Sequence, residues 1–583
     1  MSGLDWIILC VTLLGIITYG LYKSRTTKNL EGYFLSNRSM PWYLVLLSIM
    51  GTQASAVTFL SAPGQAYTDG MRFVQYYFGL PLAMVVLCIT FVPLFAKLKV
   101  FTAYEFLEKR FDLRTRTLTS FLFLLQRGLS TGISIYAPSI ILSSLFGWNI
   151  FLTNILMGGL LIIYTVSGGA KAVAYTQQLQ LVIIFIGMFL AGYMIVHLLP
   201  ESIGFTEALK ISGASGKLNV ITTGGNNNGF DWKDRYNIWS GVIGGFFLAL
   251  SYFGTDQSQV GRYLTAKNTT ESKLGLLING LVKVPMQFAI LLLGALLFTF
   301  YQFQPSPVFF NKAVEQQALT SPYRDSMVEV QKQFNKVNYS RTQLSLEYVN
   351  SKEESSGADQ SVVEQNLMSA NKKLDSLRST YKAFIKKALP AEDNNDTNYI
   401  FLRFVVDYLP VGLVGLLIAI IFLAAWGSIA AALNSLAACT MIDFHIRFKK
   451  GNIAVSEDEL SNYKNSKWYT LGWGIFCIVV AQFANKMGSL IEAVNVLGSL
   501  FYGVILGIFL VAFYVKHVGG KAVFYAAIIS EIAIFTLFIL NEKGIIGLSF
   551  LWLNAVGALL VVLIAVIVQR FVKPQTAIPN TSI

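Results

Sequence analysis

Three polar side chains interrupt the long apolar run of residues 411–440. The thirty residues include no charge, yet they include Ser428, Asn434 and Ser435. At a rise of about 1.5 Å per residue, a helix of this length crosses a bilayer. Hydroxyl and amide groups at that depth raise the free energy of the protein unless they contact another helix or an ion. The run therefore predicts a membrane helix that also contributes to a binding site.

Two other apolar segments are interrupted by small and polar residues, which predicts broken helices. The first contains GTQASAVT at 51–58, followed by Pro63 and Gly64, and the second ends in SYFGTDQSQ at 251–259. The breaks lie five predicted spans apart, so a second five-span unit would enter the membrane the other way up. Paired broken helices indicate a midplane binding site, because unwound backbone is tolerated there only around a cavity. Alternatively, the small residues only permit close helix packing.

Charged residues in or beside the predicted spans could bind a charged solute. Arg127 and Lys283 each lie about ten residues into a span, or roughly 15 Å deep. A cation there costs at least about 2.5 kcal/mol unless it faces a cavity or a partner. One hypothesis is that Arg127 or Lys283 meets the carboxylate of an anionic substrate. The other is an internal ion pair, Lys283 with Asp256 or Arg127 with Glu492, that holds helices together.

The composition of the whole chain indicates an integral membrane protein. Hydrophobic residues make up 54% of the 583 residues and charged residues 13%, whereas a soluble domain carries roughly 25% charged residues. The net charge of +13 is carried by short loops between apolar runs and does not indicate nucleic-acid binding. The four cysteines lie inside apolar segments, and the three histidines lack metal-ligand spacing. Neither a disulfide framework nor a metal centre is therefore expected from them.

Apolar segments along the chain predict an all-α integral membrane protein with about thirteen transmembrane helices. The segments are 4–22, 41–66, 74–96, 117–146, 149–166, 174–199, 238–254, 275–301, 409–441, 468–485, 488–515, 521–540 and 544–570. The excess of Lys and Arg in alternate loops predicts that the N-terminus lies outside and the C-terminus inside. The first segment has no basic stretch before it, which favours a retained helix over a cleaved signal peptide.

The segments also suggest how the chain is divided. We expect an extra N-terminal helix and cytoplasmic loop at 1–40, five-helix repeats at 41–199 and 238–515, and two C-terminal helices with a short tail at 516–583. The second repeat is interrupted by a polar insertion at 303–403, placed outside the membrane by the topology.

The insertion has heptad spacing twice. Apolar residues recur at steps of three and four from Val330 to Tyr348 and again from Val363 to Phe384, with a polar link between them. Two amphipathic helices with a short connection predict an antiparallel, extramembrane helical hairpin. It could be an insertion without a role in transport, a docking arm for a protein partner at the outer face, or a cover on the outer mouth.

Four motifs in order along the chain narrow the function. They are TAYEFLEKRF at 102–111, STGISIYAPSIIL at 130–142, TVSGGAKAVAYTQQLQ at 165–180 and GTDQSQVGRYLTAKN at 254–268. The last two resemble signatures of the sodium:solute symporter family. The first two are most similar to its branch of iodide, multivitamin and monocarboxylate carriers. The resemblance implies the LeuT-type fold of two inverted five-helix repeats. It also implies a multi-pass protein of the plasma membrane, which in a bacterium is the inner membrane.

The resemblance implies a principal sodium site between the first broken helix and the helix at 411–440. Carried over residue by residue, its ligands are the carbonyls of Gly51, Ala54 and Ala424, position Gly427, and the hydroxyl of Ser428. A hard cation prefers several oxygen ligands, which freed carbonyls beside a hydroxyl supply. Gly427 stands where the family usually has a hydroxyl, so one oxygen is missing. Thr52, Ser55 or water could replace it.

A second sodium site occurs in some members of the family. It needs an acid and hydroxyls where this chain has Gln177, Ala430 and Ala431. The resemblance therefore implies one sodium ion per cycle as the coupling ion, with no other cofactor.

The polar residues with which the family's sugar carriers hold a hexose are mostly absent. The matching positions here are Val57, Thr58, Tyr77, Leu80, Ala249 and Ile491. Tyr252 matches an aromatic gate beneath the substrate, and Lys283 matches a lysine that contacts substrate in sugar carriers. The candidate substrate residues are Thr52, Gln53, Thr58, Tyr77, Arg127, Tyr252, Asp256, Lys283 and Glu492.

These features favour a sodium-coupled symporter that imports a small polar or anionic organic solute by alternating access. A proton-coupled carrier of the same fold, and a sugar or polyol substrate, are the alternatives. A sensor or channel on the same scaffold is a further one, although a sensor usually carries a soluble signalling domain. An enzyme would need a nucleophile–base pair or a metal cluster, and neither pattern is found in the sequence. The expected partners are Na⁺, the solute and the lipid bilayer.

Overall fold

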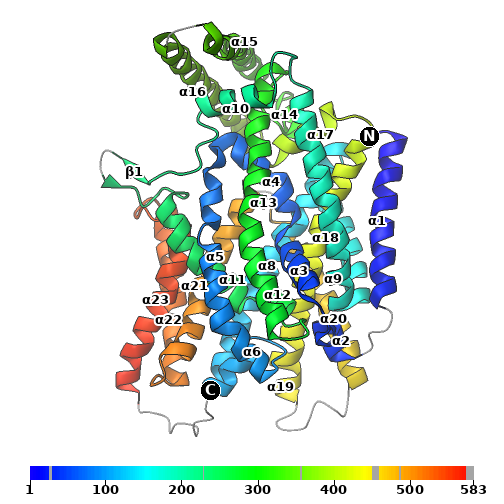
Figure 1. The fold of residues 1–583 in the computed structure, drawn as a ribbon, viewed down its shortest axis with the longest axis vertical. Coiled ribbons are helices and arrows are strands. Elements are labelled where there is room, and N and C mark those ends of the chain that lie inside the picture. The colour runs from blue at the N-terminus through cyan, green and yellow to red at the C-terminus, as the bar shows by residue number, and fades with distance from the viewer. Residues whose placement is uncertain (25–28, 227–228, 355–356, 450–458, 485–486, 573–583) are drawn as a thin grey trace.

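The protein is a bundle of long helices with a helical hairpin at one end (Figure 1). The computed structural model describes residues 1–24, 29–226, 229–354, 357–449, 459–484 and 487–572. The N-terminus lies at the hairpin end, and α23 (Phe550–Phe571) finishes at the opposite end. This arrangement agrees with an N-terminus outside and a C-terminus inside, although the predicted tail at 573–583 lies outside the described residues.

The first predicted repeat begins with the broken helix. Its elements are α3 (Trp42–Gln53), α4 (Ala56–Asp69), η2 (Met71–Tyr77), α5 (Leu80–Ile89), α6 (Phe91–Leu98), α7 (Glu105–Arg110), α8 (Leu113–Phe146) and α9 (Ile150–His197). It is preceded by α1 (Gly3–Ser24), α2 (Leu30–Leu35) and η1 (Ser36–Arg38). Gly169 divides α9 into two spans because its φ of 58° is left-handed, a conformation that favours glycine. The kink separates the two spans predicted at 149–166 and 174–199.

The second predicted repeat also begins with a broken helix. Its elements are η3 (Ser240–Gly244), α11 (Gly245–Thr255), α12 (Gln257–Tyr263), α13 (Thr269–Phe303), α17 (Ile400–Tyr408), α18 (Leu413–Cys439), η5 (Thr440–His445), α19 (Ile446–Lys449), α20 (Glu459–Ala481) and α21 (Leu490–Tyr514). α22 (Gly520–Glu542) and α23 follow it.

The outer elements include the predicted hairpin. They are α10 (Phe205–Ala214), β1 (Gly225–Asn226), β2 (Gly229–Phe230), α14 (Lys312–Ala318), α15 (Arg324–Glu354), α16 (Gly357–Ala388) and η4 (Thr397–Tyr399). β1 and β2 form one antiparallel pair, with Gly225 opposite Phe230. The predicted antiparallel hairpin is formed by α15 and α16, whose seam buries Val330, Phe334, Leu374 and Tyr381. Part of the predicted polar link lies outside the described residues.

All thirteen predicted segments lie largely within helices of the described chain. By length and composition alone, eight of these helices could cross a membrane, or nine if the bent pair α3 and α4 is one span. Two further segments are shorter apolar helices, at 150–163 and 240–255. The remaining two, α8 and α20, are long but more polar. The predicted all-α membrane fold is confirmed.

α18 is the central helix of the bundle. Its most apolar window is 83% buried inside the protein, against 22% for α1 and 28% for α22. A helix that is apolar all round is stable in such a position, and small residues along α18 let its neighbours approach closely. α1 and α22 instead expose most of their apolar surface, as helices facing lipid do.

Asp5 fixes the peripheral helix α1 to the start of α18. Its side chain is buried, and one carboxylate oxygen accepts hydrogen bonds from the amides of Gly412, at 2.6 Å, and Gly415, at 3.1 Å. The carboxylate therefore caps α18, whose first amides have no partner within their own helix.

We expect Asp5→Ala to lower the free energy of unfolding by about 1–2 kcal/mol, because two buried amides lose their acceptor. Thermal unfolding of the purified protein in detergent measures this. Asp325→Ala, at an exposed position in the first turn of α15, is the control and should leave the melting temperature unchanged. Equal melting temperatures for the two variants would contradict the cap.

Candidate functional site

The first helix break leaves two carbonyls without their helical donors. α3 ends at Gln53 and α4 begins at Ala56, at an angle of 59°. The amide of Ser55, which would bind the carbonyl of Gly51 in a continuous helix, donates to Gln53. Likewise the amide of Thr58 donates to Ser55 rather than to the carbonyl of Ala54. Both carbonyls named in the predicted sodium site are therefore free of their usual helical bonds.

The break lies within the predicted stretch at 51–58. Gly51 is still helical, and the backbone leaves the helix three residues later, at Ala54, where φ is −76° and ψ is 72°. The carbonyl of Gly51 is nevertheless freed, because the last turn of a helix leaves its carbonyls unbonded.

α18 brings two more of the predicted oxygens together. The hydroxyl of Ser428 lies 3.1 Å from the carbonyl oxygen of Ala424 and borders the central cavity. The carbonyl of Gly427 accepts a hydrogen bond of 3.0 Å from the Gln177 amide. Thr52, suggested as a replacement ligand, donates to the carbonyl of Ser48 at 2.8 Å. Ser55, like Thr52, borders the central cavity, next to the break.

Gln177 on α9 links α3 to α18. Its side-chain amide accepts from the Ser48 hydroxyl at 2.8 Å and donates to the Thr52 hydroxyl at 3.2 Å, as well as to Gly427. A Cβ atom on Gly51 would lie 2.8 Å from the Cβ atom of Gln177, so glycine is needed for this close approach. Gln177 is thus a neutral strut between the two helices.

The region expected for a second sodium ion holds apolar side chains. Val173, Ala430 and Ala431 are buried together, with Ile17 packed against them. Side chains of this kind offer no oxygen to a hard cation.

A central cavity of about 140 Å³ lies beside the first break. One water needs roughly 10–15 Å³ of such space, so the cavity can hold a small solute. Seven of the nine candidate substrate residues border it: Thr52, Gln53, Thr58, Tyr77, Arg127, Tyr252 and Lys283. Asp256 and Glu492 do not border it.

Several polar residues of the cavity were missed from the sequence. They are Tyr76, Ser130, Thr131, Ser134, Asn495 and Tyr502. Ser130 and Ser134 stand one helical turn apart on α8, within the motif at 130–142. Their spacing was a usable signal, since residues four apart share one face of a helix.

Arg127 pairs with Asp256 rather than with Glu492. Its Nε atom lies 3.6 Å from Oδ2 of Asp256, and its guanidinium also donates to Ser258. Asp256 stands at the second break, where it caps α12 and accepts a 2.8 Å bond from the hydroxyl of Tyr502. The predicted pairing with Glu492 is wrong because Glu492 lies at the outer end of α21, where Arg235 binds it at 2.7 Å.

Lys283 is a buried cation without a carboxylate partner among the described residues. Its side chain is 1% exposed, and its Nζ atom lies 5.6 Å from the ring centroid of Tyr77. The predicted pairing with Asp256 is wrong, since Arg127 takes that carboxylate. An aromatic face stabilises a cation only partly. Among the described residues, no carboxylate therefore balances a positive charge on the amine of Lys283.

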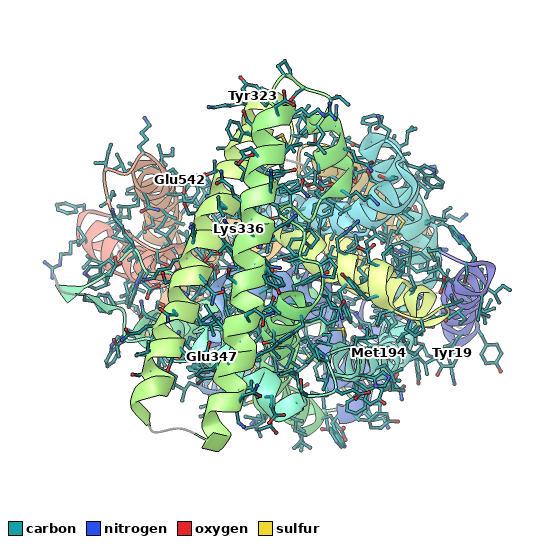
Figure 2. All side chains as sticks on the ribbon, turned by 90° about the horizontal axis from the view of Figure 1, so that it is seen from above. Tyr19, Met194, Tyr323, Lys336, Glu347 and Glu542 are labelled. Carbon is teal, nitrogen blue, oxygen red and sulfur yellow. The ribbon has the colours of Figure 1, made fainter. Side chains whose placement is uncertain are left out.

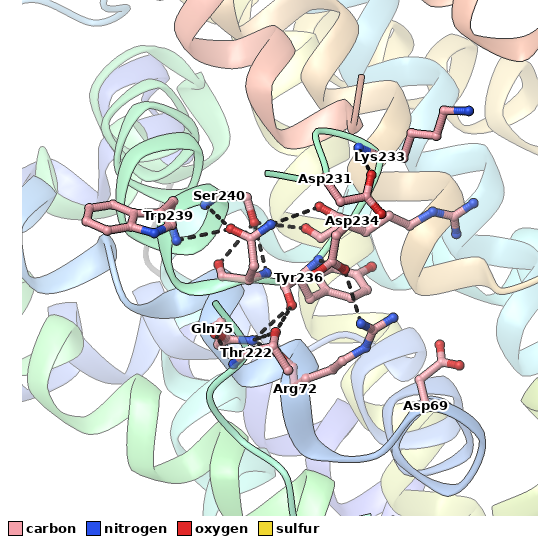
Figure 3. A network of polar contacts seen from close by, with 12 residues as sticks. Asp69, Arg72, Gln75, Thr222, Asp231, Lys233, Asp234, Tyr236, Trp239 and Ser240 are labelled. Carbon is pink, nitrogen blue, oxygen red and sulfur yellow. Dashed lines mark hydrogen bonds and ion pairs between the residues drawn. The ribbon is translucent and has the colours of Figure 1, made fainter. Parts of the chain in front are cut away.

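A polar pocket of about 820 Å³ lies on the outer side of the cavity. Figure 3 shows its network, in which Arg72 binds Asp234 at 3.1 Å. Tyr76 follows Arg72 in η2, and Asn495 lies on α21. The hydroxyl of Tyr76 donates a hydrogen bond of 3.0 Å to Asn495, and both residues border the central cavity. The rings of Phe73 and Tyr76 stack with centroids 5.5 Å apart. These side chains form a layer between the two spaces.

Comparisons with known proteins agree with this geometry. The family model described as the sodium:solute symporter family matches residues 33–321 and 379–530. This chain belongs to the sodium:solute symporter family. It is a multi-pass membrane protein that couples solute symport to sodium, the coupling ion, as predicted.

Relatives and a solved structure support the same fold. The sodium/sialic acid symporter SiaT of Proteus mirabilis is 25% identical over 576 residues, covering 98% of this chain and 96% of that protein. The human sodium/iodide cotransporter is 30% identical over 277 residues, which cover 47% of this chain and 41% of that protein. A solved structure of a Na⁺-coupled sialic acid symporter in a substrate-bound outward-open state has a TM-score of 0.73 at 23% identity. It covers 98% of this chain and 99% of that one, which confirms the predicted fold.

We expect Gly51→Ala to raise the sodium concentration for half-maximal uptake by at least about fivefold. The new Cβ would displace Gln177, and overpacking of this kind costs about 1–3 kcal/mol. Uptake into proteoliposomes at varied sodium measures the effect. Gly159→Ala on α9, where a Cβ would meet nothing within 4 Å, is the matched control. The same sodium dependence in both variants would show that the close approach at Gly51 is not needed.

Proposed function

We propose that the protein imports a small anionic organic solute with one sodium ion by alternating access. The observation that carries the proposal is Lys283, buried in the cavity without a carboxylate partner among the described residues. A buried cation is stabilised by an anion that enters the cavity. Arg127 borders the same cavity, and an anion could share its guanidinium with Asp256.

The class of solute is inferred from the cavity and from the relatives' names. Val57, Leu80, Ala249 and Ile491, which match sugar-binding positions, border the cavity with apolar side chains. Such side chains cannot donate hydrogen bonds to the hydroxyls of a hexose. The relatives are named for sialic acid, iodide and monocarboxylates. We therefore favour a carboxylate over a sugar or polyol.

The sodium site would be formed by the carbonyls of Gly51, Ala54 and Ala424, the Ser428 hydroxyl, and Gly427 without a side-chain oxygen. Support comes from the two freed carbonyls at the break and from Ser428, which borders the central cavity together with residues of the break. Ser55 or water would supply a further ligand. The apolar cluster of Val173, Ala430 and Ala431 supports one sodium ion rather than two.

Coupling would follow from the shared wall of the two sites. Sodium entering from outside would draw the break against α18, and α4 and α18 both border the solute cavity. One sodium ion that moves inward gains about 2.3 kcal/mol per 100 mV of membrane potential. A monoanion that moves with it offsets this gain, so the sodium concentration gradient would drive uptake. On the inner side, Tyr252 is held by Gln259 at 2.8 Å and would release to open the cytoplasmic path. No covalent step is needed, so we propose no enzymatic activity.

The division of the chain follows the same scheme. Residues 41–199 and 238–515 would be the inverted repeats, with 1–40 and 516–583 as additions and 303–403 as an outer insertion. The proposed location is the inner membrane of a bacterium.

We expect uptake to require sodium and to show a Hill coefficient near one. Ser428→Ala removes a side-chain oxygen of the proposed site, so half-maximal uptake should need at least about tenfold more sodium, since a bond to a charged group contributes about 1.5–3 kcal/mol. Ser435→Ala, on the same helix, is the control. Uptake that persists when choline replaces sodium at constant pH would instead favour proton coupling. A sodium-to-solute flux ratio of two would contradict the single site.

We expect Lys283→Gln to reduce anion uptake at least about tenfold, because the cavity loses its uncompensated charge. Competition by sialic acid, short monocarboxylates, iodide and hexoses for binding to purified protein identifies the solute class. Lys336→Gln, exposed on the hairpin (Figure 2), is the control. Unchanged uptake and affinity in Lys283→Gln would remove this lysine from the solute site.

A further inference from the structure

The outer hairpin is an addition that the family does not explain. The family model matches residues to 321 and resumes at 379, so it omits 322–378, which is α15 and most of α16. Figure 2 shows the hairpin lying across the outer end of the bundle, with Lys336 near its middle. The hairpin therefore lies over the outer ends of the membrane helices.

The hairpin is attached to the transmembrane bundle by specific hydrogen bonds. Arg341 donates to the carbonyl of Tyr301 at 3.1 Å, and Thr342 donates to that of Gln302 at 2.6 Å, both at the outer end of α13. Asn371 on α16 donates to the hydroxyl of Ser215, at the end of α10, at 3.2 Å. These contacts hold α15 and α16 against the bundle, rather than leaving them as an arm that projects from it.

The chain that returns from the hairpin is held by a buried carboxylate. Asp396 has a side chain that is 1% exposed and lies 2.5 Å from Nζ of Lys382 and 3.4 Å from Nη2 of Arg378, both on α16. It also accepts from the amide of Phe310 at 2.8 Å. Burial alone would raise the pKa of Asp396, but Lys382 and Arg378 lower it by more, so the carboxylate stays ionised. Asp396 is therefore fixed to the hairpin by charge.

Thr397, the residue after Asp396, contacts α4, the outer half of the first broken helix. A Cβ atom on Gly64 of α4 would lie 2.0 Å from the carbonyl oxygen of Thr397, so the two backbones touch. One turn further along α4, the ring of Tyr67 lies below Arg378, with 5.6 Å between the guanidinium carbon and the ring centroid. The hairpin helix α16 and the return chain thus both contact α4.

Asn398, the residue after Thr397, binds the start of α21. Asn398 donates to the carbonyl of Gly488 at 2.9 Å and accepts from the amide of Leu490 at 3.4 Å, at the start of α21. Residues Asp396, Thr397 and Asn398 therefore connect the hairpin, α4 and α21 in succession. Ser489 connects the same two helices directly, since its hydroxyl donates to Gln65 at 3.1 Å.

α4 and α21 are two walls of the central cavity. Val57 and Thr58 from α4 face it, and Ile491, Val494 and Asn495 from α21 face it too. In the alternating access proposed above, the outer ends of these helices would part to admit a solute from outside. The residues 396–398 span both ends, so they must release at least one of them when that happens.

We propose that residues 396–398 are a latch on the outer gate, and that the hairpin sets the strength of this latch through Lys382 and Arg378. The proposal rests on the alternating access proposed above. Asp396 and Asn398 are positioning residues, because they act on solute entry through α4 and α21 and touch no solute. Of the roles considered for the insertion, this proposal favours a cover on the outer mouth. The hairpin would act through the latch, and no protein partner is required.

The latch can be tested by labelling a cysteine inside the cavity from the outer side. Val494→Cys is introduced after Cys10, Cys88, Cys439 and Cys477 are replaced by alanine. A membrane-impermeant thiol reagent then reports how often the outer gate opens. We expect Asn398→Ala and Asp396→Asn each to raise the labelling rate by about 2- to 30-fold, the range for residues that modulate a two-state coupling.

Two variants of the same chemistry serve as controls. Asn366→Ala and Asp325→Asn change exposed positions of the hairpin and should leave the labelling rate unchanged. Gly64→Ala should raise it, since the added methyl pushes Thr397 away. Thermal unfolding of each variant shows whether the gate alone or the whole fold has changed.

The outcomes separate the latch from the transport scheme. Equal labelling rates in Asn398→Ala, Asp396→Asn and the controls, with all proteins folded, would overturn the latch. A labelling rate of the Val494→Cys parent protein that does not respond to sodium would overturn the proposed coupling instead. A raised rate in the latch variants would still support the latch in that case.

Discussion

A carbonyl that leaves a helix inside a membrane must find another positive partner, and this constraint governs the transport site. In lipid there is no bulk water to replace a lost amide donor. At the break between α3 and α4, the amides of Ser55 and Thr58 turn to nearer acceptors, so the carbonyls of Gly51 and Ala54 lose their donors. A small cation is a partner that can arrive and leave. The same backbone geometry therefore creates both a site and a reason for α18 to lie beside it.

The charges around the cavity follow a related constraint. Arg127 is compensated by Asp256, which stands at the second break and caps α12. Lys283 has only the ring of Tyr77 beside it among the described residues. A buried cation with incomplete compensation stabilises whatever anion enters the cavity, and it disfavours sodium there. Lys283 would thus help to keep the proposed sodium site and the proposed solute site distinct, although both sites would lie next to α4.

The sequence predicted the helices well, because each membrane segment is apolar over a length that lipid requires. It placed both breaks, since Gly51–Thr58 and Ser251–Gln259 concentrate polar residues within apolar runs. It also predicted the hairpin from heptad spacing. The ion pairs were assigned wrongly, because which carboxylate faces Arg127 depends on the rotation and depth of α8 against α11 and α12. Neither quantity is encoded in spacing along one segment. The hydrogen bonds of Gln177 could not be predicted from the sequence either, since α3, α9 and α18 meet only in the folded bundle.

The strut and the break together make the two halves of the first helix unequal. Gln177 holds the inner half, α3, against α18 through Ser48, Thr52 and Gly427, with no ion required. The outer half, α4, meets the rest of the protein through the latch residues and Ser489. In the proposed scheme, a hinge at Ala54 and Ser55 would let α4 move while α3 stays fixed. Sodium bound at the hinge would favour one orientation of α4, and the hairpin would favour the same orientation from the outer side. A neutral glutamine in place of a second cation would leave this hinge under the control of the one sodium ion that we propose.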